Sequence, residues 1–219
     1  MRTAGPGAGI LKSPAGGPVK LLLASANAGK QREFAALLAP LGLELVLQGA
    51  LGIDSVAETG TTFEENALLK ARHAAALGAM PALADDSGLE VDALDGRPGV
   101  WSARYAGASA SDNDNNARLL AELAGVPLGR RRARYRCVLA LVRDAGDDAP
   151  LTASGSWEGR IASAPAGSGG FGYDPLFVPE GYEATVAELP VALKNAHSHR
   201  AKALAALVAA LRGLDRGLE

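Results

Sequence analysis

Residues 19–47 read VKLLLASANAGKQREFAALLAPLGLELVL. An apolar run over 19–24 precedes an alanine-rich run over 29–41, and a second apolar run follows over 43–47. The outer runs predict buried strands and the middle run predicts a helix, because its apolar residues recur at helical spacing. Strand, helix and strand in this order are typical of an α/β protein.

Two more helices are predicted further along the chain. Thr62-Phe63-Glu64-Glu65 has the spacing of a capping box and opens a helix with alanines and leucines on one face. Another helix begins after Ser198, and its leucines again share one face. The 219 residues are 48% hydrophobic, enough for a sizeable core. We expect a disordered leader over 1–18, rich in Gly, Pro and Ala, and a single domain over 19–215.

Charge and cysteine content narrow the possible partners. The formal net charge of −2 gives no electrostatic reason to expect nucleic-acid binding. No stretch approaches the roughly 18 uninterrupted apolar residues of a membrane span, and residues 1–18 lack the features of a signal peptide. Cys137 is the only cysteine, so a buried thiol is expected rather than a disulfide. A soluble protein of the reducing cytoplasm fits these features.

The basic run Arg130–Arg136 has two interpretations. It is either a patch for nucleic acid or one face of a strand. From Arg132 on, basic residues alternate with Ala133, Tyr135 and Cys137, which is the period of a strand. A strand with a solvated or dimer-facing side is therefore favoured.

Two adjacent acids, Asp85 and Asp86, follow the apolar residues 81–84 and precede Ser87 and Gly88. A polar turn between two short strands is one interpretation, since Asp, Ser and Gly are common in turns. The other is a site for a hard cation such as Mg²⁺, for which one or two carboxylates suffice. Because successive strand residues point to opposite faces, at most one of the two acids is expected to face a cleft.

Ser25, Ala26, Asn27, Ala28, Gly29 and Lys30 form a turn of small residues that leads from the first strand into the first helix. A helix N-terminus with free backbone donors and a lysine is an anion site, and phosphate is its natural ligand. The turn is not a P-loop, because Ala24 and Gln31 stand where that motif needs Gly and Ser or Thr. The alternative is a helix cap at Asn27 with a solvated lysine.

Two downstream segments also carry side chains that are suited to binding a ligand. Residues 167–172 match the dinucleotide pattern G-x-G-x-x-G, but Tyr173-Asp174-Pro175 follows instead of a helix, so the match is accidental. The loop still offers Phe171 and Tyr173 as aromatic faces and Asp174 as an acceptor. Residues 194–200 place two cations and two histidines around the start of the last helix, where cations oppose the helix dipole. An anionic or hydrogen-bonding ligand explains them better than zinc does.

Together these segments resemble the HAM1-like family of inosine/xanthosine triphosphate pyrophosphatases. Five separated motifs occur in the family's order, at 25–30, 58–67, 84–107, 169–175 and 198–200. The resemblance covers nearly everything after the leader. It implies an elongated mixed β-sheet with flanking helices, two lobes around a central nucleotide cleft, and usually a homodimer.

The resemblance also implies an activity and roles for particular residues. The activity is Mg²⁺-dependent hydrolysis of ITP, dITP and XTP to the monophosphate and pyrophosphate. Asp86 is expected to accept a proton and bind the metal, with Glu58 as the second metal ligand. The residues expected to bind substrate are Ser25, Ala26, Asn27, Ala28, Gly29, Lys30, Ser87, Phe171, Gly172, Tyr173, Asp174, Lys194, His199 and Arg200.

Two alternatives remain at this point. A non-catalytic nucleotide-binding protein would keep the glycine loops without requiring both Asp86 and Glu58. A Maf-type pyrophosphatase would share the fold and chemistry but prefer other nucleotides, and the motifs at 171–174 and 198–200 favour the HAM1-like interpretation over it.

Overall fold

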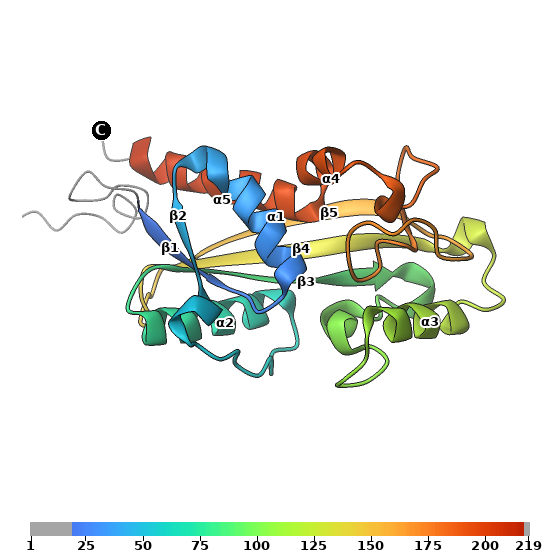
Figure 1. Ribbon diagram of the computed structural model, residues 1–219, viewed down its shortest axis with the longest axis horizontal. Coiled ribbons are helices and arrows are strands. Elements are labelled where there is room, and N and C mark those ends of the chain that lie inside the picture. The colour runs from blue at the N-terminus through green and yellow to red at the C-terminus, as the bar shows by residue number, and fades with distance from the viewer. Residues whose placement is uncertain (1–18, 217–219) are drawn as a thin grey trace, which may run out of the picture. The chain divides into compact units, whose positions relative to one another are not determined.

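The computed structural model describes residues 19–216, without the side chains of 214–216. The leader predicted over 1–18 lies outside the described residues. Six strands form one sheet in the order β2-β1-β3-β4-β5-β6 (Figure 1). Their bounds are Lys20–Ala24 (β1), Glu44–Leu47 (β2), Ala82–Val91 (β3), Arg132–Val142 (β4), Leu151–Ile161 (β5) and Phe177–Pro179 (β6). Since β1 is parallel to β2 and β3 while β5 is antiparallel to β6, the mixed sheet is confirmed.

Five α-helices flank the strands in the described part of the chain. They are Ala28–Leu38 (α1), Phe63–Gly78 (α2), Asp112–Glu122 (α3), Val191–His197 (α4) and His199–Arg216 (α5). Between residues 19 and 216, none of these helices has the length and apolarity needed to cross a membrane.

The predicted helices are confirmed with small shifts at their ends. The helix expected over 29–41 ends at Leu38 and continues as a 3₁₀ turn over 39–41 that contains Pro40, because proline lacks the N–H that an α-helix needs. Thr62 and Glu65 form the predicted capping box, in which the side chain of each residue accepts the backbone N–H of the other residue.

The chain forms two compact units, each built from several segments. The described residues of the first unit are 19–86, 138–154 and 203–216, and those of the second are 87–137 and 155–202. In the first unit, α1 and α5 cover one face of the strands and α2 covers the other (Figure 1). Leu21 and Leu83 line the same apolar space as Leu38 and Leu207, whereas Leu22 lies beside Gly78 of α2. Successive residues of β1 therefore serve opposite faces.

The second unit has an aromatic core of its own. The Tyr135 and Phe177 ring centroids lie 4.6 Å apart, and those of Trp157 and Phe177 lie 6.0 Å apart. Leu119 of α3 and Leu123, which directly follows this helix, belong to the same buried cluster. These contacts hold α3 in the unit through its C-terminal half.

The strand interpretation of the arginine run is confirmed. Ala133, Tyr135 and Cys137 are buried, whereas the side chain of Arg134 is 26% exposed. The Arg134 guanidinium pairs with Glu90, Asp92 and Glu158, which explains a basic strand without a nucleic-acid ligand.

Of the two interpretations of Asp85 and Asp86, the polar turn between two short strands is wrong. Both acids, Ser87 and Gly88 lie inside the continuous strand β3, which is the third of six strands and not at an edge of the sheet. Turn preference is local and weak, and the strands on either side of β3 override it.

Candidate active site

The two acids of β3 point to opposite faces of the first unit. Asp85 follows Leu83 on the face covered by α1, and its Oδ2 lies 3.0 Å from Lys30 Nζ. Asp86 faces α2, and its Oδ1 lies 2.7 Å from Lys70 Nζ. The alternation along a strand explains this separation. Each acid therefore has its own lysine.

Asp86, Glu58 and Lys70 form a compact charged cluster. Lys70 Nζ lies 2.7 Å from Asp86 Oδ1 and also 2.7 Å from Glu58 Oε1. Burial raises the pKa of Asp86 above its ordinary value, and the charges of Lys70 and Lys30 only partly offset this effect. Burial lowers the pKa of Lys70, but attraction to Asp86, Asp85 and Glu58 outweighs burial and leaves that pKa raised.

Asn66 connects this cluster to the loop that carries Glu58. Its side chain is fully buried, its Nδ2 donates to Asp86 Oδ2 over 3.3 Å, and its Oδ1 accepts from the Gly60 N–H over 2.8 Å. Sequence reasoning missed both Asn66 and Lys70. A signal existed, because the two polar residues stand four apart beside an apolar face and so lie one turn apart on the same side of α2.

The carboxylates fit a small divalent cation. Between residues 19 and 216, no group of three or more His, Cys, Asp or Glu side chains is arranged to hold a metal. Glu58 and Asp86 nevertheless converge on one position, where the Lys70 ammonium pairs with both and offsets one of their two negative charges. Two carboxylates completed by water and substrate phosphates are an ordinary Mg²⁺ site, so the donor set fits that ion.

The turn from β1 into α1 combines a helix cap with exposed backbone. Asn27 caps α1 by accepting the Lys30 N–H over 3.0 Å, and the Ser25 hydroxyl accepts the Asn27 N–H over 3.3 Å. Ala26, Asn27 and Ala28 are exposed, while Gly29 is buried. The cap alternative is thus correct for Asn27, but Lys30 is paired with Asp85 and is not a solvated lysine.

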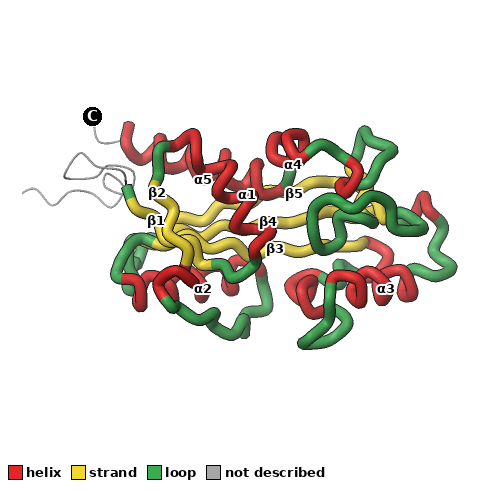
Figure 2. The backbone as a smooth tube through the Cα atoms, viewed as in Figure 1, coloured by secondary structure: helices red, strands yellow, loops and turns green. Residues whose placement is uncertain are grey.

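In the second unit, residues 162–176 form the loop between β5 and β6 (Figure 2). No helix follows the glycine cluster, which confirms that the dinucleotide pattern is accidental. Gly170 and Gly172 adopt φ angles of +74° and +62°, and a Cβ on Gly170 would lie 2.0 Å from Asp174 Oδ2. Glycine at 170 lets the loop close around this carboxylate.

Asp174 is the buried centre of the predicted base-binding residues. Its Oδ1 accepts from the Tyr135 hydroxyl over 3.1 Å, and its Oδ2 accepts from Lys194 Nζ over 2.5 Å and from the Phe171 N–H over 2.9 Å. Tyr173 is 4% exposed and donates its hydroxyl to the Ser102 carbonyl. Its ring therefore belongs to the core, and Phe171 is the more accessible aromatic face.

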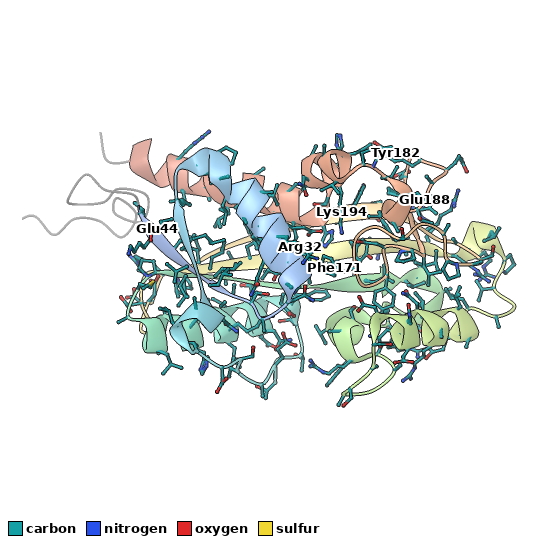
Figure 3. All side chains as sticks on the ribbon, in the orientation of Figure 1. Arg32, Glu44, Phe171, Tyr182, Glu188 and Lys194 are labelled. Carbon is teal, nitrogen blue, oxygen red and sulfur yellow. The ribbon has the colours of Figure 1, made fainter. Side chains whose placement is uncertain are left out.

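Cations surround the Phe171 ring. Lys194 Nζ lies 4.6 Å and the Arg200 guanidinium carbon 5.3 Å from the ring centroid, and Phe171 and Lys194 are labelled in Figure 3. Arg200 also donates to the Ser87 hydroxyl over 2.8 Å. His199 stacks on Tyr135 with centroids 4.7 Å apart, a partner that sequence reasoning missed because it is 64 positions away in the chain. The second unit thus gathers hydrogen-bond donors beside an aromatic face, a suitable arrangement for a heteroaromatic base.

Comparisons with known proteins agree with this chemistry. A protein from Methylococcus capsulatus described as dITP/XTP pyrophosphatase is 59% identical over 198 residues, which cover 90% of this chain and 98% of that protein. A protein of the same description from Xanthomonas oryzae is 57% identical, covering 89% and 98%.

Solved structures also match. A HAM1 protein from Coxiella burnetii superposes with a TM-score of 0.81 at 44% identity, covering 89% of this chain and 98% of that one. A nucleoside-triphosphatase or dITP/XTP pyrophosphatase from Mycobacterium abscessus gives a TM-score of 0.70 at 46% identity, covering 86% and 98%. Since the model of the Ham1 family also matches residues 21–210, the chain belongs to the Ham1 family.

Proposed function

We propose that this protein hydrolyses the non-canonical purine nucleoside triphosphates ITP, dITP and XTP to the monophosphate and pyrophosphate. The observation that carries the proposal is the pair of acids on β3, each ion-paired to a different lysine on a different face. Relatives described as dITP/XTP pyrophosphatases, at up to 59% identity, support the same activity.

In this proposal the first unit handles the triphosphate. The exposed backbone at the start of α1 and Lys30 bind phosphate oxygens, because a helix N-terminus and a lysine both favour negative charge. Glu58 and Asp86 would hold Mg²⁺, which when bound would offset phosphate charge and polarise the phosphoryl group. Asp86 orients the attacking water and accepts its proton, for which a raised pKa is favourable. The water oxygen bonds to a phosphorus atom of the α–β anhydride as that anhydride bond breaks, which releases the monophosphate and pyrophosphate.

The second unit selects the base. Phe171 provides the stacking face, while Lys194 or Arg200 donates to the 6-oxo group of hypoxanthine or xanthine. Adenine presents a 6-amino donor there, and each buried donor left without an acceptor costs about 1–3 kcal/mol. This difference explains rejection of ATP.

A panel of nucleoside triphosphates with Mg²⁺ tests the activity, with pyrophosphate and orthophosphate measured separately. We expect pyrophosphate from ITP, dITP and XTP and little from ATP. Orthophosphate alone, or equal turnover of ATP and ITP, would contradict the proposal. Binding without any product would instead indicate a non-catalytic nucleotide-binding protein.

The role of Asp86 is tested by Asp86→Asn. The variant should retain most of its affinity for ITP, because the phosphate and base contacts remain, and should lose most turnover. Unchanged turnover would refute proton acceptance by Asp86. Titration with Mn²⁺, followed by its electron paramagnetic resonance signal, tests the metal role separately, since this variant should also bind the ion more weakly.

We further propose that the enzyme is a homodimer of the cytoplasm. The single, buried Cys137 supports a reducing compartment. Light scattering coupled to size-exclusion chromatography measures the assembly, and a mass near 22.3 kDa would contradict the dimer.

A further inference from the structure

The loop residues 171–174 are anchored along their whole length within the second unit. Asp174 accepts the Phe171 N–H, Tyr173 donates to Ser102, and Asp174 accepts from Tyr135 and Lys194. Gly172 has no side chain, and its φ of +62° lies in the left-handed region that glycine adopts easily. Its anchors must therefore act on the backbone.

Helix α3 supplies those anchors. Asp112 Oδ2 accepts the Gly172 N–H over 2.6 Å, and Asn116 Nδ2 donates to the Gly172 carbonyl over 2.9 Å. The two residues stand four apart on α3 and so lie on one side of it. The N–H belongs to the peptide that follows Phe171, and the carbonyl belongs to the peptide that precedes Tyr173. The two hydrogen bonds thus fix both peptide planes around the most flexible residue of the loop.

The buried Asn116 amide has a hydrogen-bond partner for only one of its two polar atoms among the described residues. It is 6% exposed, and its Oδ1 is buried and finds no hydrogen-bond partner among residues 19–216. A buried acceptor left unsatisfied costs free energy, so the Oδ1 atom supplies no hydrogen-bond reason for an amide at this position. The hydrogen bond of Asn116 Nδ2 goes to the Gly172 carbonyl.

We propose that Asp112 and Asn116 are positioning residues for base recognition. By holding Gly172 they set the position of the Phe171 ring beside Lys194 and Arg200. The inference rests on the proposed function and extends it to residues that do not touch the nucleotide. Loss of either bond loosens the ring, so affinity for the base falls while the groups that act on the triphosphate are unchanged.

The test compares Asn116→Ala with Asn115→Ala. The adjacent Asn115 is a matched control: it is 2% exposed, lies on the same helix and also bonds a loop, through Ala106 N–H and the Ala103 carbonyl. Asn116→Ala and Asp112→Ala should each raise KM for ITP about tenfold, with kcat within about twofold. Asp112→Asn keeps an acceptor and should restore most of the affinity. Asn115→Ala should leave KM within about twofold.

Two binding measurements separate this role from general destabilisation. Calorimetric affinity for inosine monophosphate, which carries the base, should fall about tenfold in Asn116→Ala. Inhibition by inorganic pyrophosphate, which has no base, should be unchanged. Equal behaviour of Asn116→Ala and Asn115→Ala, or an equal loss of both ligands, would overturn the inference. If the wild type releases no pyrophosphate from ITP, the proposed function fails. The affinities for inosine monophosphate still test whether Asp112 and Asn116 position the loop.

Discussion

Replacing Lys70 by Met tests whether one ammonium stabilises both carboxylates of the charged cluster. Lys70 Nζ lies 2.7 Å from Glu58 Oε1 and 2.7 Å from Asp86 Oδ1, and the three side chains are 14%, 22% and 6% exposed. At an effective dielectric constant of about 20, each contact is worth about 6 kcal/mol of Coulomb attraction. Desolvation of the ions, at several kcal/mol each, cancels most of this gain.

The net loss of unfolding free energy is expected to be about 3 kcal/mol at pH 7. Removing one partner of a buried ion pair costs about 3–5 kcal/mol, and the lower end applies because water reaches Glu58. Urea denaturation measures the loss. Lys20→Met is the control, since Lys20 and Glu44 are 59% and 45% exposed and an exposed pair contributes about 0–1 kcal/mol.

The pH dependence distinguishes this cause from a packing defect. Without Lys70, the pKa of Asp86 rises further above the ordinary value of an aspartate, so the folded state binds protons more tightly than the unfolded state. Stability of the variant relative to the wild type must then improve as the pH falls from 7 toward 4. A deficit that is constant across this range, or a variant as stable as the wild type at pH 7, would refute the reasoning.

Three further predictions concern substitutions of single residues. Arg143 holds the pKa of Asp147 at about 2, so the ionised carboxylate stabilises the fold above pH 3.8 and this contribution is lost as the pH falls toward 2. Urea denaturation of Asp147→Ala should therefore show a loss of unfolding free energy of about 2 kcal/mol at pH 7, and this loss should shrink in acid. Gly170→Ala should weaken inosine monophosphate binding because its Cβ would meet Asp174, whereas Gly181→Ala, also at positive φ but in open space, should not. Asn66→Ala should lower kcat for ITP about tenfold with little change in KM, because it frees Asp86 from the Gly60 loop; an unchanged kcat would exclude a positioning role for Asn66.

Local sequence was sufficient for the elements of the fold. The alternation over 19–47 gave the first strand, helix and strand, because apolar periodicity reports which residues meet a core. The capping box at Thr62 and Glu65 and the strand period from Arg132 were also correct, since each depends on neighbours within a few positions.

The candidate site was only partly predictable for the same reason. The acids, the glycine loop and the cations of 194–200 were visible as unusual residue types. Their partners were not, because Lys70 reaches Asp86 across 16 positions, Tyr135 reaches Asp174 across 39 and Asn116 reaches Gly172 across 56. No local pattern encodes such separations.

The sequence by itself thus determined an α/β chain with two adjacent acids of chemical interest. Tertiary structure decided which face of the sheet and which lysine partner each acid has. Inside the sheet, β3 runs straight through a segment whose composition favours a turn, and the pleat of that strand assigns Asp85 to Lys30 and Asp86 to Lys70. The physical reason is that a strand's neighbours, rather than its own residues, determine whether it continues, and its continuation determines which face each side chain takes.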